Sequence, residues 1–188
     1  MPIPAYLIIA IVVFAILYFV APTALTAFRR FRGKRLVTCP ETRQPAGVDV
    51  DVKHATLTAL AGPPDLRLKH CTRWPERQDC GQECLLQIEL APEECKVQHI
   101  LTSWYEDKAC AVCGKPFGAI HLYDHKPALL NPDDHTVEWQ QLRVEQIPAA
   151  LEAARPICWD CHILKTFMRE HPDLVIARPA RHVQQAGK

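Results

Sequence analysis

The chain has 188 residues, with 22 basic and 21 acidic side chains and a formal net charge of +1. Its length suits one ordinary domain or two very small ones. Five of the basic residues crowd into residues 29–35, and without them 17 basic side chains face 21 acidic ones, which argues against nucleic-acid binding. The 16 Pro and 9 Cys predict short elements joined by many turns.

The N-terminal segment is strongly apolar. Residues 1–28 carry no charged side chain, and as a helix the almost purely apolar residues 5–21 would span about 26 Å at roughly 1.5 Å per residue. A domain this small cannot bury a helix that is apolar all round. A cleaved secretory signal would begin with basic residues, whereas residues 2–5 read Pro-Ile-Pro-Ala. We therefore expect residues 1–28 to form one transmembrane anchor.

A basic juxtamembrane linker, residues 29–36, follows the anchor. It contains five basic side chains: Arg29, Arg30, Arg32, Lys34 and Arg35. Positive charge on one flank of a membrane span favours the cytoplasmic side. We expect a single-pass protein of the inner or plasma membrane, with its N-terminus outside and its C-terminal domain in the cytoplasm.

Residues 37–106 are expected to form a first cysteine-containing module. Apolar periodicity and turn residues predict a strand, a helix, a second strand and two more helices, at residues 36–40, 54–60, 66–71, 80–90 and 97–105.

Four cysteines of this module are candidate metal ligands: Cys39, Cys71, Cys80 and Cys84. The first two end predicted strands, and the last two, four residues apart, would share one face of a helix. Together they could make a second tetrahedral thiolate site or hold an iron–sulfur cluster. Buried free thiols, or mixed sites that use His54 or His70, are the alternatives. Cys95 is expected to lie outside the group.

Residues 107–177 are expected to form a second module. After a turn at residues 110–116, the pattern predicts a hairpin with strands near 119–123 and 136–139 and a polar break at 131–134. Helices are predicted at 146–154 and from Cys158 to a stop at Pro172. Residues 178–188 are expected to be a frayed tail.

Two Cys-x-x-Cys pairs, Cys110/Cys113 and Cys158/Cys161, flank the 44 residues between them. A tight turn, indicated by Gly114, would let the first pair chelate an ion, and a helix N-terminus would favour thiolates at the second. Four thiolates at about 2.3 Å suit tetrahedral Zn²⁺. Disulfides are disfavoured in the cytoplasm, so the pairs predict a metal site.

The order of a cysteine turn, a hairpin and a cysteine pair on the first turn of a helix resembles a treble-clef zinc finger. The resemblance covers roughly residues 108–171 and implies that Cys110, Cys113, Cys158 and Cys161 share one Zn²⁺ ion.

Two other interpretations of the second pair remain open. The sequence Cys158-Trp-Asp-Cys161-His162 also fits the attachment motif of c-type haem, with His162 as the iron ligand. Such attachment is expected outside the cytoplasm, against the charge bias. A redox dithiol at a helix N-terminus is the third interpretation, although no buried strand is predicted to run into the pair.

The remaining residues indicate no reaction. His121 and His125 would share one face of a strand and could ligate a metal, although such histidines are more often surface residues. The sequence contains no Gly-rich phosphate loop, nucleophile elbow or HExxH pair. We therefore expect an α+β fold and a non-enzymatic, membrane-anchored zinc protein that binds a protein partner. The alternative is a redox or electron-transfer subunit with haem c or an iron–sulfur cluster.

Overall fold

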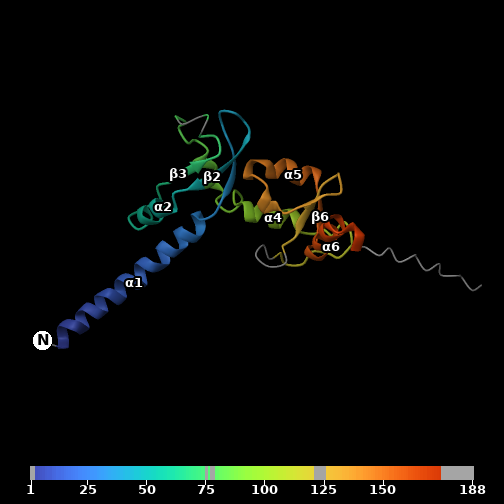
Figure 1. Cartoon of the computed structure of the whole chain (residues 1–188). Helices are drawn as coiled ribbons and strands as arrows, with labels where there is room; N and C mark the ends of the chain where they lie inside the picture. Colours follow the sequence, from blue (N-terminus) through green and yellow to red (C-terminus); the bar gives the residue numbers. More distant parts are fainter. Residues whose placement is uncertain (1–2, 75, 77–78, 121–125, 175–188) are drawn as a thin grey trace, which may run out of the picture.

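The computed structural model of the chain describes residues 3–74, 76, 79–120 and 126–174 and shows a mixed helix and sheet architecture behind one long helix (Figure 1). The α-helices are α1 (Ile3–Phe31), α2 (Val52–Thr58), α3 (Leu85–Leu90), α4 (Val97–Tyr105), α5 (Ile147–Ala153) and α6 (Trp159–Glu170). The strands are β1 (Arg35–Thr38), β2 (Pro45–Val50), β3 (Leu68–Cys71), β4 (Ala128–Leu130), β5 (Thr136–Val137) and β6 (Arg155–Ile157). Short 3-10 helices are η1 (Trp139–Gln141), η2 (Val144–Gln146) and η3 (Pro172–Leu174).

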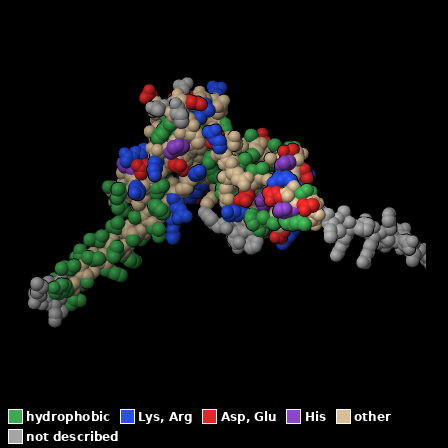
Figure 2. Space-filling view, in the orientation of Figure 1, with side chains coloured by type: hydrophobic (Ala, Val, Ile, Leu, Met, Phe, Trp, Pro, Cys, Tyr) green, Lys and Arg blue, Asp and Glu red, His purple; other side chains and the backbone are tan. Residues whose placement is uncertain are grey.

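Helix α1 extends away from the folded part of the chain, and its projecting surface is almost entirely hydrophobic (Figure 1, Figure 2). Its segment Tyr6–Phe31 is long enough to cross a membrane, and the most apolar 18 residues of the segment have a mean hydropathy of 2.6. The most apolar part of this segment is not buried against the rest of the molecule, so α1 is not a core helix of the described fold.

The C-terminal end of α1 is fixed to the domain by two basic side chains. The fully buried guanidinium of Arg35 donates hydrogen bonds to the carbonyls of Arg30 and Pro92. Lys96 Nζ donates to the carbonyl of Arg29 at 3.1 Å. The last carbonyls of a helix have no partner within the helix, so these contacts satisfy them and join the anchor to the domain.

The first half of the folded region is built on an antiparallel sheet in the order β1-β2-β3. Helix α2 begins after Asp51, whose carboxylate accepts a hydrogen bond from the His54 N–H at 3.1 Å, as an N-cap does. The core between the sheet and the helices includes Phe31 from the end of α1, Val48 from β2 and Ile88 from α3.

The helix predicted at residues 80–90 is shorter than expected. Helix α3 begins at Leu85, Cys84 is its N-cap, and Cys80 lies in the preceding loop. The prediction that Cys80 and Cys84 share a helical face is therefore wrong. Gly81 and Gln82 lie between them, and Gln82 adopts a positive φ of 56°, a conformation that a helix does not allow.

The second half contains an antiparallel sheet in the order β5-β4-β6, packed beside α4 and α5. The buried hydroxyl of Tyr105, at the end of α4, donates to the carbonyl of Ala128 in β4 at 2.8 Å. This bond ties the helix to the hairpin strand that pairs with β6, the strand that precedes the second cysteine pair.

The hairpin of the second half differs from the predicted one. Its strands are β4 and β5, joined by the polar turn at residues 131–134, and residues 119–120 are not in a strand. Residues 121–125 lie outside the described residues. The strand that pairs with β5 is the more apolar run Ala128–Leu130. All three of its residues are buried, so it shows no alternation of apolar and polar residues.

The two halves meet where β2 approaches η2. A Cβ atom placed on Gly47 would lie 2.7 Å from the Cβ of Val144, so only glycine permits this approach. The division into modules at residues 37–106 and 107–177 stays a prediction.

Candidate metal centre

Four cysteine sulfurs meet in the second half of the chain. The Sγ atoms of Cys110, Cys113, Cys158 and Cys161 all lie within 4.8 Å of one another. The Cys113 and Cys158 sulfurs are 3.8 Å apart. Ligands at about 2.3 Å from a tetrahedral Zn²⁺ ion lie about 3.8 Å from one another, so this spacing suits one metal ion.

The first pair lies on a tight turn. Gly114 has a φ of +71° and donates its N–H to the carbonyl of Cys110 at 2.9 Å, while the Cys110 N–H donates to the carbonyl of Lys115 at 2.9 Å. A residue with a Cβ atom would be strained at this φ. The turn predicted from Gly114 is therefore present, and it directs both thiols to one side.

The second pair lies at the start of α6. Cys158 is the N-cap residue and Cys161 lies in the first turn of the helix. Aligned peptide dipoles make a helix N-terminus favourable for anions, which include thiolates.

Backbone contacts hold the two pairs together across the 44 residues that separate them. The Ala111 N–H donates to the carbonyl of Pro156 in β6 at 2.8 Å, and the Cys158 N–H donates to Cys110 Sγ at 3.3 Å. These contacts use backbone groups, which do not depend on the type of residue. For this reason the sequence did not predict β6.

The thiols differ in how easily they ionise. Burial alone would raise the pKa of Cys110, but backbone N–H groups of Cys113, Cys158 and Val112 and the Cys113 thiol lower it to about 6. Burial, followed by the neighbouring thiols, raises the pKa of Cys161. Burial also raises the pKa of Cys158, and its contacts with the Cys110 and Cys113 thiols raise it further. Four adjacent thiolates repel one another, so a divalent cation is what would let all four ionise.

The geometry favours a shared ion over the two other interpretations. In the haem interpretation the Cys158 and Cys161 sulfurs would bond a macrocycle, whereas here they face Cys110 and Cys113. For the redox-dithiol interpretation, strand β6 does lead into the second pair, contrary to the expectation. It is antiparallel to β4, however, so it does not form the βαβ unit of thioredoxin-like proteins.

His162 is a buried residue of α6, with 7% of its surface exposed. Its Nε2 lies 3.9 Å from Glu138 Oε1, and its Nδ1 has no hydrogen-bond partner. Burial lowers the pKa of this imidazole. Burial therefore favours the neutral form of the ring.

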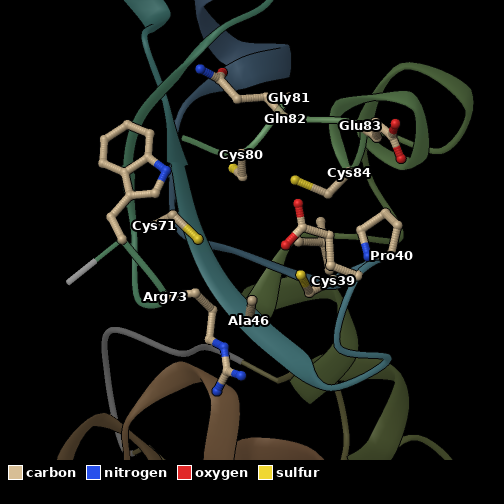
Figure 3. Close-up of a pocket in the computed structure, with 13 residues that line it drawn as sticks. Cys39, Pro40, Ala46, Cys71, Arg73, Cys80, Gly81, Gln82, Glu83 and Cys84 are labelled. Carbon is tan, nitrogen blue, oxygen red and sulfur yellow. The ribbon is translucent and has the colours of Figure 1, made fainter. Parts of the chain in front are cut away.

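The other four predicted ligands, Cys39, Cys71, Cys80 and Cys84, line a separate cavity in the first half of the chain (Figure 3). Burial, followed by the three neighbouring thiols, raises the pKa of Cys84 to about 11. His54 is paired instead with Asp65, with Nε2 2.7 Å from Oδ2. Cys95 lies apart, with its thiol 3.6 Å from the carbonyl of Gln87.

The predicted pair His121 and His125 lies outside the described residues.

Comparisons with known protein families, with curated protein sequences and with solved structures find no match to this chain.

Proposed function

We propose that the chain is a membrane-anchored, non-enzymatic zinc-binding protein that acts as an interaction or accessory module. The observation that carries this proposal is the convergence of four sulfurs within 4.8 Å from two segments far apart in sequence. Zn²⁺ is favoured over other divalent ions because a compact all-thiolate set suits a soft, tetrahedral ion.

The element order supports a treble-clef-like description of this half. A cysteine turn, the β4–β5 hairpin and a helix that begins at the second pair follow one another, with η1, η2, α5 and β6 inserted before the helix. In this proposal the metal holds the turn against the start of α6, as a structural ion does.

Helix α1 supplies the membrane anchor in this proposal. Its continuity into the domain, and the contacts of Arg35 and Lys96 with its last carbonyls, argue for an anchor that stays attached over a signal that is removed. The exposed basic side chains at its base support a cytoplasmic orientation of the domain at an inner or plasma membrane.

Zinc and the iron-based alternative differ in colour. Elemental analysis of the full chain purified in detergent should find zinc, with no absorption at visible wavelengths, because the d shell of Zn²⁺ is filled. Iron with visible absorption would instead favour the redox or electron-transfer alternative, with haem c or an iron–sulfur cluster.

A protein partner at the membrane is the second part of the proposal. Helix α6 exposes four large apolar side chains that are 44 to 53% accessible: Ile163, Leu164, Phe167 and Met168. An exposed apolar stripe on a helix is typical of an interaction surface. The protein would present this stripe close to the membrane and so raise its effective concentration for membrane-bound partners.

The stripe can be tested by site-specific crosslinking in membranes. A photoreactive amino acid at Phe167 should form a discrete adduct with a protein, whereas the same group at Leu57, an equally apolar and more exposed position on α2, should not. The additional substitution Leu164→Ser should reduce the adduct from position 167. Equal labelling from positions 57 and 167 would contradict this assignment of the surface.

A further inference from the structure

We propose that the first half of the chain holds a second Zn²⁺ site, with Cys39, Cys71, Cys80 and Cys84 as its four ligands. The thiols come from separate places in the fold: the end of β1, the end of β3, the following loop and the N-cap of α3. All four line one cavity, and the sulfurs of Cys39, Cys71 and Cys84 point into it (Figure 3). The site shares no residue with the first one and does not depend on it.

The cavity has a suitable size and lining for a metal ion. Its volume is about 30 Å³, and its wall combines the four thiols with apolar groups such as Val37, Ala46 and Trp74 and with the charged residues Glu41, Arg73 and Glu83. A space of this size is large enough for a water molecule, which needs about 10–15 Å³, but water also needs two to four good hydrogen-bond partners. Thiols are weak partners for water and strong ligands for zinc.

The second set is more open than the first. Among the described residues, the first site is the only group of three or more such ligand atoms that all lie within 4.8 Å of one another. The sulfurs of the second set are therefore farther apart around their cavity. Rotation of a cysteine side chain between staggered χ1 positions moves its sulfur without moving the backbone. Cys39 and Cys80, which are half-buried and lie outside helices and strands, have more freedom to turn towards an ion than the buried Cys71 and Cys84.

The four thiols also lie where a metal ion would stabilise the small core of this half. The three-stranded sheet and two short helices of this half form a small core, and Cys71 and Cys84 belong to it. Domains below about 70–80 residues rarely gain enough stability from a hydrophobic core alone and often use a metal or disulfides. The thiols here are free, and one ion would tie both outer strands, β1 and β3, to the start of α3.

Zinc stoichiometry tests the proposal on the full chain purified in detergent. We expect two zinc ions per wild-type chain. Cys71→Ser and Cys80→Ser should each retain one, Cys113→Ser should retain one, and the Cys80→Ser/Cys113→Ser double variant should retain none. Cys95→Ser is the matched control, because Cys95 packs beside the same core outside the cavity, and it should retain two.

The variants separate failure of this site from failure of the first. One zinc per wild-type chain that Cys113→Ser removes and Cys80→Ser retains would overturn the second site and leave the first intact. The opposite pattern would overturn the first site alone. Iron with visible absorption that depends on Cys80, or a disulfide among the four thiols detected by mass, would overturn the zinc assignment.

A second measurement covers variants that fail to fold. In the wild-type chain, alkylation counted by mass should modify Cys39, Cys71, Cys80 and Cys84 only after a chelator has removed zinc. Alkylation of these four at the same rate with and without zinc would overturn the proposal.

Discussion

Replacing Cys110 or Cys161 with alanine should remove zinc from the first site and unfold the half of the chain around it. A structural Zn²⁺ ion contributes an apparent binding free energy of about 10 kcal/mol or more, comparable with the net stability of a whole small domain. Cys110 belongs to the turn and Cys161 to α6, so both variants should lose the same ion and show the same loss of stability. Metal content and thermal unfolding of the purified variants check this result.

His162 provides the comparison that separates zinc from haem. In the zinc proposal it only follows Cys161 along α6, so His162→Ala should keep the metal. The imidazole is buried, and its loss should still cost about 1–3 kcal/mol through the cavity it leaves. His162→Asn, which fills part of that space with a polar group, should cost less. If His162→Ala lost the metal while Cys110→Ala kept it, the zinc assignment would be wrong.

Membrane orientation has the second large expected effect. A reporter that is active only outside the cytoplasm, fused after Lys188, should be silent, because the basic linker favours the cytoplasmic side. Replacing four exposed side chains with glutamine and adding lysines before α1 should invert the chain and activate the reporter. The four are Arg29, Arg30, Arg32 and Lys34.

Arg35 must remain in that inverted variant. Its guanidinium is buried and bonded to the carbonyls of Arg30 and Pro92, so its replacement would damage the fold as well as the charge bias. The contacts of Arg30 and Arg29 with Arg35 and Lys96 use backbone carbonyls and survive the glutamine substitutions. An active reporter on the unaltered chain would contradict the proposed cytoplasmic orientation.

Local features of the chain were predictable because their causes are local. The apolar run of α1 is helical and exposed, as its composition demands. Gly114 marks the turn of the first pair, and Pro148 and Pro172 mark the start of α5 and the end of α6. Each of these signals acts within a few residues of its position.

Errors arose where pairing across the sheet outweighed the local pattern. The alternation at 119–123 predicted a strand of the hairpin; residues 119–120 are not in one and 121–123 lie outside the described residues. The hairpin strand is β4 at Ala128–Leu130, which pairs with both β5 and β6. A central strand buried on both faces needs no alternation, so its sequence could not reveal it. Likewise, Cys80 is excluded from α3 by a loop conformation that the spacing of two thiols does not encode.

The sequence by itself determined which residues could bind a metal, because thiolate chemistry and paired spacing are properties of the chain. The sequence also predicted that Cys110 and Cys113 meet Cys158 and Cys161, but only the tertiary structure decided how the two pairs are brought together. That meeting depends on β6 and on the bond from the Ala111 N–H to the Pro156 carbonyl, and backbone groups are the same in every non-proline residue. The tertiary structure also decided that Arg35 serves as a buried cap of α1, since its partners Arg30 and Pro92 are brought to it by the fold.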